Sequence, residues 1–140
     1  MNSLRNFLGT GLLVVAGVAS AATVSVTFVQ PEKFTDAGYS RGRATQRELA
    51  ELQQEMQWHL QRLADRKLAA SDTLQVEVLD IDLAGDFEFN RLTRFSDVRV
   101  VRDIASPRIK LRYTLTQGDR VVTGSDEQLS DMNFLWHHMP

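Results

Sequence analysis

Alternating apolar and polar residues predict two β-strands in the first part of the chain. Residues 23–29 and 74–83 both repeat with a period of two, which places alternate side chains on opposite faces of an extended strand. In the second segment the apolar face changes at Val78-Leu79. We therefore expect residues 74–83 to form a central strand that either contains a β-bulge or is covered on both faces there.

A long amphipathic helix is predicted at residues 45–69. Thr45 and Glu48 have the capping-box spacing, in which a threonine hydroxyl and a glutamate carboxylate bond free backbone amides at the start of a helix. One stripe, about a quarter of the helix circumference wide, collects the apolar residues Leu49, Leu52, Met56, Leu60 and Leu63. Such a stripe is suited to packing on one face of a sheet.

Residues 97–129 are predicted to form a three-stranded antiparallel region. Val98 and Val100 indicate a first strand, and apolar residues alternate with polar ones through 109–116 in the second. The sequence Gln117-Gly118-Asp119 supplies a turn, after which the third strand returns as the hairpin partner.

These elements predict one α+β domain over residues 22–140. Its sheet is antiparallel or mixed with about four to five strands, and the long amphipathic helix packs on one face. Ser130 is a candidate cap for a short C-terminal helix that would contain Leu135 and Trp136.

Residues 1–21 have the three parts of a secretory signal peptide. These are a positive charge at Arg5, an apolar run over residues 7–19, and small residues that end at Ala21. The apolar run is shorter than the roughly 20 residues of a membrane-spanning helix, which argues against an N-terminal anchor. We expect export to the periplasm of a Gram-negative bacterium, with cleavage after Ala21 and no transmembrane segment in the mature chain.

Composition limits the classes of protein to be considered. A chain of 140 residues with 43% hydrophobic and 24% charged residues is typical of one globular domain. A net charge of -2 gives no concentrated basic surface, so we do not expect nucleic acid as a partner. The absence of cysteine excludes disulfides, thiolate metal sites and cysteine nucleophiles.

An acidic cluster at the end of the central strand is the main candidate for chemistry. Its members are Asp80, Asp82, Asp86 and Glu88. Calcium and similar cations bind several carboxylate oxygens within a short loop, so the cluster is a candidate metal site. It does not match an EF-hand loop, because two ligand positions are occupied by Ala84 and Arg91. The alternative is a solvated strand end and turn, where aspartate is common.

Trp58 is predicted to lie on the polar face of the helix, opposite the apolar stripe. It could anchor a partner protein, since tryptophan is enriched at binding hot spots, or lie beside Arg62 in a cation–π contact. His59 is predicted to be a packing residue at the edge of the stripe, and His137-His138 lack the spaced partners of a metal site. We find no motif for a serine nucleophile, a phosphate loop, a dinucleotide fold or a zinc protease.

Four short motifs carry a family resemblance. They are P-E-K-F-T-D at 31–36, L-A-D-R-K-L at 63–68, V-L-D-I-D-L-A-G-D at 78–86 and L-S-D-M at 129–132. With these motifs the chain resembles the bacterial exported family known as domain-of-unknown-function family 3016. The resemblance covers most of the chain after residue 21 and implies an exported protein of proteobacterial type with no assigned activity.

Two hypotheses for function follow from the sequence. The first is an exported, non-enzymatic binding or accessory module of the cell envelope that needs no cofactor and binds an unidentified protein or envelope ligand. The alternative is a divalent-metal binder or a metal-assisted hydrolase that uses the acidic cluster Asp80, Asp82, Asp86 and Glu88.

Overall fold

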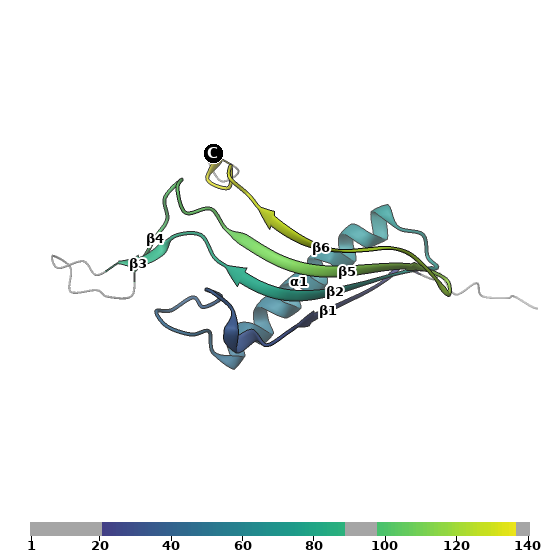
Figure 1. Cartoon of the computed structure of the whole chain (residues 1–140), viewed down its shortest axis with the longest axis horizontal. Coiled ribbons are helices and arrows are strands. Elements are labelled where there is room, and N and C mark those ends of the chain that lie inside the picture. Colours follow the sequence, from purple (N-terminus) through teal and green to yellow (C-terminus); the bar gives the residue numbers. More distant parts are fainter. Residues whose placement is uncertain (1–20, 89–97, 137–140) are drawn as a thin grey trace, which may run out of the picture.

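The fold places one long helix on a four-stranded sheet, with a small second sheet at one end (Figure 1). A computed structural model of the chain describes residues 21–88 and 98–136. In chain order the elements are β1 (Thr23–Phe28), the 3₁₀ turn η1 (Pro31–Lys33), α1 (Gln46–Lys67), β2 (Asp72–Asp82), β3 (Asp86–Glu88), β4 (Val98–Val100), β5 (Arg108–Gln117) and β6 (Arg120–Ser130).

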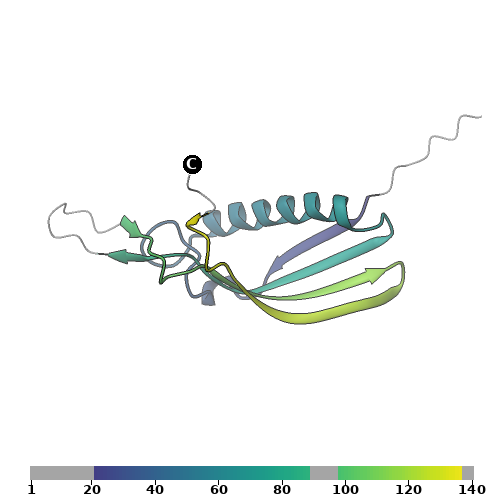
Figure 2. The same ribbon diagram turned by 90° about the horizontal axis from the view of Figure 1, so that it is seen from above.

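The main sheet is mixed and has the strand order β1-β2-β5-β6. β1 and β2 are parallel and are joined by α1, whereas β2, β5 and β6 are antiparallel neighbours. α1 packs on one face of the sheet, which we call the inner face (Figure 2). The predicted α+β class, with a mixed sheet and one long helix on one face, is confirmed.

The β-bulge that was one of the two alternatives at Val78-Leu79 is present in β2. Val78 pairs with Leu111 and Asp80 pairs with Lys110, so Leu79 has no partner on β5. Because a bulge adds one residue to one strand, the apolar side chains before and after it can face the same core.

α1 begins with the predicted capping box. The Thr45 hydroxyl accepts a hydrogen bond from the Glu48 amide, and the Glu48 carboxylate accepts from the Thr45 amide at 2.7 Å and from the Tyr39 amide at 2.9 Å. These hydrogen bonds favour the ionised carboxylate and hold the pKa of Glu48 below its usual range. No helix in residues 21–88 or 98–136 is long and apolar enough to cross a membrane.

The predicted three-stranded region is only partly correct. β5 and β6 form the predicted hairpin, with Gly118 of the turn at φ 56°. β4, however, pairs with β3 in a separate two-stranded sheet. The Gly85 amide donates to the Ala105 carbonyl at 3.2 Å, and the Ala105 amide donates to the Arg102 carbonyl. This turn keeps β4 beside the segment that follows β2 and away from β5.

No α-helix follows Ser130 in the described residues, which end at Trp136, a residue in 3₁₀ conformation whose amide donates to the Asn133 carbonyl at 2.9 Å. Ser130 is the last residue of β6, where it pairs with Arg108, and its hydroxyl bonds the Pro107 carbonyl at 3.1 Å. Residues 132–135 form turns. Pairing of the hairpin thus continues through the residue that was expected to cap the helix.

Burial falls across the sheet from β1 to β6. The buried apolar residues of the sheet lie in β1 and β2, the inner-face residues of β5 are half-buried, and all residues of β6 are exposed. A helix is about 10 Å wide and strands are spaced by about 4.8 Å, so one helix cannot cover four strands. The inner face of β5 and β6 is therefore only partly covered.

Candidate functional site

Two of the sequence motifs, residues 31–36 and 78–86, meet at one end of the main sheet. The Asp80 carboxylate accepts from the Thr35 amide at 2.7 Å and from the Thr35 hydroxyl at 2.9 Å. Next to this pair, the Asp36 amide donates to the carbonyl of Ile81 at 2.8 Å. The backbones of Asp36 and Asp82 form an isolated parallel β-bridge. The motif residues thus attach the loop after β1 to the end of β2.

Arg99 on β4 is the centre of the polar network at this end. Its guanidinium makes a bidentate pair with the Asp36 carboxylate at 2.7 and 2.8 Å, and it also donates to the carbonyls of Gly38, Ala84 and Gly85. It lies over the Phe87 ring, 4.4 Å from the centroid. Its side chain is 17% exposed, so these contacts fix the small β3-β4 sheet to the main fold.

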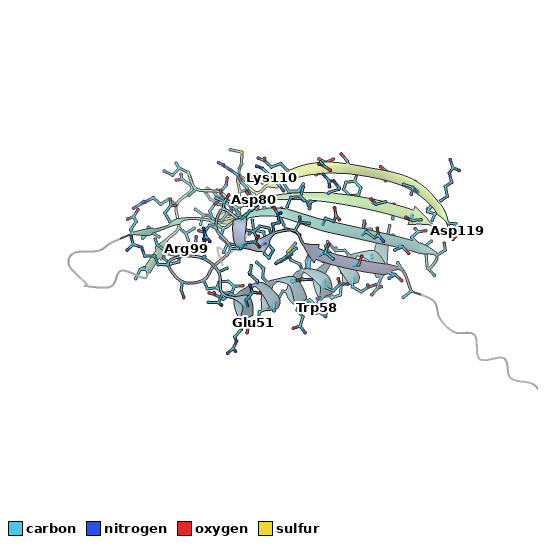
Figure 3. The ribbon with its side chains drawn as sticks, turned by 60° about the horizontal axis from the view of Figure 1, so that its bottom comes forward. Glu51, Trp58, Asp80, Arg99, Lys110 and Asp119 are labelled. Carbon is cyan, nitrogen blue, oxygen red and sulfur yellow. The ribbon has the colours of Figure 1, made fainter. Side chains whose placement is uncertain are left out.

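A polar pocket of about 250 Å³ lies on the opposite face of the sheet from α1. Its lining residues are Thr35, Asp80, Asp82, Arg108, Lys110 and Gln128. Figure 3 shows Asp80 and Lys110 near each other at this end. Burial raises the pKa of Asp82; Arg108 opposes this shift, and the nearby Asp36, Asp80 and Asp86 add to it. The two cations in the pocket offset its two carboxylates.

The structure separates the four predicted metal ligands. Asp80 and Asp82 line the polar pocket, whereas Asp86 and Glu88 belong to β3. Arg102 donates to both oxygens of Glu88 and lowers the pKa of that carboxyl. Within residues 21–88 and 98–136, no group of three or more histidine, aspartate or glutamate side chains is arranged to hold a metal ion. Arg91, which occupies a ligand position when the cluster is compared with an EF-hand loop, lies outside the described residues. His137 and His138 lie outside them too.

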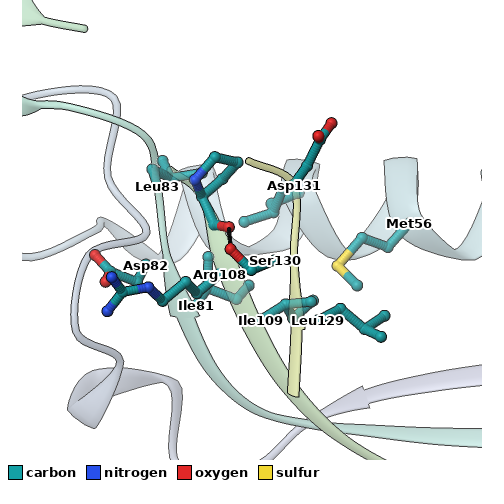
Figure 4. Close-up of a pocket in the computed structure, with 11 residues that line it drawn as sticks. Met56, Ile81, Asp82, Leu83, Arg108, Ile109, Leu129, Ser130 and Asp131 are labelled. Atoms are coloured by element: carbon teal, nitrogen blue, oxygen red, sulfur yellow. Dashed lines mark hydrogen bonds between the residues drawn. The ribbon is translucent and has the colours of Figure 1, made fainter. Parts of the chain in front are cut away.

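An apolar groove lies between α1 and the inner face of β5 and β6, and we call it the α1–β6 groove. It consists of two adjoining cavities of about 390 and 540 Å³. Both cavities are lined by the same four apolar residues, which are Leu52, Met56, Ile109 and Leu129. Figure 4 shows the first cavity, with Met56 on the helix opposite Ile109 and Leu129 on the strands.

Trp58 stands at the open side of this groove. Its side chain is 60% exposed and lines the larger cavity together with Glu55, His59 and Leu60. The Arg62 guanidinium lies 4.5 Å from the ring centroid, so the predicted cation–π contact is confirmed. His59 is exposed at the groove rather than part of the core. A role of Trp58 in partner binding stays a prediction.

The groove was not anticipated from the sequence, although the patterns did identify its members as apolar residues of predicted elements. Leu52 and Met56 belong to the predicted helical stripe, and Ile109 belongs to the best alternating strand. What the patterns do not contain is the distance between these elements, which leaves the side chains facing a cavity instead of one another.

A comparison with known protein families matches residues 22–139 to the model described as "Protein of unknown function (DUF3016)". No curated protein and no solved structure matches the chain. The family match covers every helix and strand of the fold and all four sequence motifs. The chain therefore belongs to the DUF3016 family, as its motifs indicated.

Proposed function

We propose that the protein is an exported, non-enzymatic binding module of the cell envelope and that its binding site is the α1–β6 groove. The observation that carries the proposal is the continuity of the two cavities, which share Leu52, Met56, Ile109 and Leu129 as walls. Concave, mainly apolar surfaces of several hundred Å³ are the usual form of a ligand-binding site. Apolar ligand surface buried there contributes to affinity through the hydrophobic effect.

The dimensions of the groove favour a helix as the ligand. β5 and β6, whose inner face is only partly covered, are together about 10 Å wide, which is the width of one helix, and amphipathic helices commonly bind in apolar grooves. Charge at the rims favours a basic flank on that helix. Three carboxylates line the two cavities, those of Glu55, Asp82 and Asp131, against one cation, Arg108. The proposed ligand is an amphipathic helical segment with lysine or arginine beside its apolar stripe.

The binding proposal predicts a change in Trp58 fluorescence. The chain has two tryptophans, so Trp136→Phe leaves Trp58 as the single emitter. A synthetic amphipathic helix of leucine and lysine should shift its emission to shorter wavelength in a saturable way, because the ring loses contact with water. Leu129→Glu should weaken this binding by roughly tenfold or more, since it places a charge in the groove.

Two controls make this experiment specific to the groove. Ile104→Glu introduces the same charge at a residue that is 83% exposed and outside both cavities, and it should leave affinity unchanged. A scrambled peptide of the same composition should produce no saturable shift, since it has no apolar stripe. Equal binding by both peptides, or by both glutamate variants, would exclude the groove as the site.

Export is a separate part of the proposal and has its own test. It is supported by Arg5, the apolar run and the small residues up to Ala21, and the family match begins at the next residue. Protein isolated from the periplasmic fraction should begin at Ala22. Ala21→Tyr should block cleavage, because signal peptidase needs a small residue there, whereas Ser20→Tyr at the tolerant middle position should not. A full-length chain in the cytoplasm would contradict export.

The metal-binding alternative stays a prediction. Asp82 gives it limited support, since burial and, to a smaller extent, the neighbouring Asp36, Asp80 and Asp86 raise its pKa, and a cation would relieve the repulsion between these carboxylates. Arg108 in the same pocket already supplies positive charge. Calorimetric titration with calcium, magnesium, manganese and zinc that gave no heat would remove this alternative.

A further inference from the structure

The two edge strands of the main sheet differ in how their backbones are covered. β1 is one edge, and three glutamines of α1 bond its backbone directly. The Gln57 side chain accepts from the Val26 amide at 2.8 Å and donates to the Val24 carbonyl at 2.6 Å. Gln61 likewise accepts from the Val24 amide at 3.1 Å, and Gln53 donates to the Val26 carbonyl at 2.8 Å.

The glutamine row works because its spacing matches that of a strand. Residues four apart on a helix are separated by about 6 Å, and residues two apart on a strand by about 6.6 Å. A glutamine amide also has the same donor and acceptor groups as a peptide bond. Gln53, Gln57 and Gln61 therefore occupy the hydrogen-bonding positions of a further strand, so β1 cannot accept another one.

β6, at the other edge, is exposed along its whole length (Figure 1). It has eleven residues and no proline. Ten of these residues pair with β5 along one edge of the strand, which leaves the other edge unpaired by the sheet. Val121, Val122 and Leu129 are 62%, 49% and 52% exposed and lie near its two ends. A long exposed edge of this kind is a template for another strand.

We propose that β6 pairs with β6 of a second copy of the chain, in antiparallel orientation about a two-fold axis at Ser125. Ser125 is the middle residue of β6, so this register centres the pair on the stretch from Thr123 to Glu127, which is free of the bulge at Val122. Around the axis it places Gly124 opposite Asp126 and Thr123 opposite Glu127, and no like charges meet. Beyond Thr123 the bulge at Val122 puts Val121 on the outer face with Thr116, whereas Leu129 lies on the inner face with Ile109, so the regular part of the pair runs from Thr123 to Glu127.

Alternative registers are less favourable. An axis at Asp126 or Glu127 would place that carboxylate directly opposite its own copy, and like charges in that arrangement destabilise a strand pair. An axis at Gly124 would place Val122 opposite Asp126. The bulge between β5 and β6, where Val122 has no partner, is three residues from Ser125 and leaves Thr123 to Glu127 regular around the axis.

The covered β1 edge limits this association to two copies. A sheet with two free edges could extend indefinitely, but the main sheet, as far as the structure describes it, has one free edge in each copy, and pairing uses it. Residues opposite each other in an antiparallel pair lie on the same face, so both α1 helices lie on one side of a continuous eight-stranded sheet. The proposal concerns the strand edge and does not depend on what the groove binds.

Cysteine cross-linking tests the register, because the chain has no cysteine of its own. Opposite residues of an antiparallel pair have Cα atoms about 4.5–5.5 Å apart, within the range of about 4.4–6.8 Å that a disulfide requires. Ser125→Cys should therefore give a disulfide-linked dimer under mild oxidation. Thr123→Cys, on the same strand, should not, because its two copies would be separated by about 13 Å along the strand.

The purified protein should behave as a reversible dimer in analytical ultracentrifugation. Ser125→Lys should shift it to the monomer by placing two like charges at the axis, while Ser25→Lys on β1 should leave the dimer intact. Circular dichroism spectra matching the unmodified protein would show that each variant is folded. A monomer at high micromolar concentration, or a dimer in which the 123 and 125 cysteines cross-link equally, would overturn the proposal.

Discussion

Replacing Gly85 by alanine is expected to destabilise the fold by roughly 3 kcal/mol or more. A Cβ at this position would lie 2.4 Å from the Val100 carbonyl oxygen and 2.8 Å from the Val101 Cα, and these are backbone atoms that cannot rotate away. Gly85 also has φ +77°, where side chains other than glycine are strained. The substitution would therefore force β3 and β4 apart or move the end of β2.

Gly118 provides the matched control for this experiment. It has φ +56° in the β5-β6 turn, but a Cβ there would meet nothing within 4 Å. Gly118→Ala should cost only the backbone strain, about 1 kcal/mol. Denaturant unfolding of both variants separates strain from close approach. If Gly85→Ala lost no more stability than Gly118→Ala, the inference that the Val100 backbone leaves no room for a side chain at Gly85 would be wrong.

Local patterns predicted the elements whose side chains meet neighbours in a regular way. The alternation in β5 and the capping box at Thr45 depend on residues that are close together in the sequence. Both were predicted correctly. The change in parity at Leu79 was also visible within a single strand, but the sequence left open whether it meant a bulge or cover on both faces.

Features that depend on contacts between distant segments were missed. Val98 and Val100 have the pattern of a strand, but pairing with β3 instead of β5 is decided by the contacts of Arg99 with residues far away in the chain. Gln53, Gln57 and Gln61 look like ordinary polar residues of a helix surface. Their role on β1 appears only when the helix is placed beside the strand.

The candidate binding site could be predicted only in part. The sequence identified the acidic cluster as the main candidate for a metal site. In the structure, however, the Asp80 carboxylate accepts hydrogen bonds from Thr35, and the Glu88 carboxylate accepts them from Arg102. Asp80 of the cluster instead joins the motif at 78–86 to the motif at 31–36. The α1–β6 groove exists because one helix covers part of a four-stranded sheet, and this is a property of the number of elements, not of any motif.

Replacing Arg99 by methionine is expected to cost roughly 3 kcal/mol of folding free energy. Methionine keeps much of the apolar stem that lies over Phe87 but removes all five hydrogen bonds of the guanidinium. The Asp36 carboxylate, 23% exposed, would lose its cation, and three backbone carbonyls would lose a donor. Arg99→Lys should recover only a small part, because one ammonium group cannot reach both carboxylate oxygens and the carbonyls.

Arg112→Met is the matched control, because Arg112 also pairs with carboxylates but is 52% exposed. Water can replace its contacts with Glu77 and Asp126, so its loss should cost less than about 1 kcal/mol. Adding Asp36→Asn to Arg99→Met should then restore part of the lost stability, since it removes the unpaired charge. Urea unfolding of the single and double variants measures this coupling. Strictly additive losses would show that Arg99 stabilises the β3-β4 sheet through its carbonyl contacts and not through Asp36.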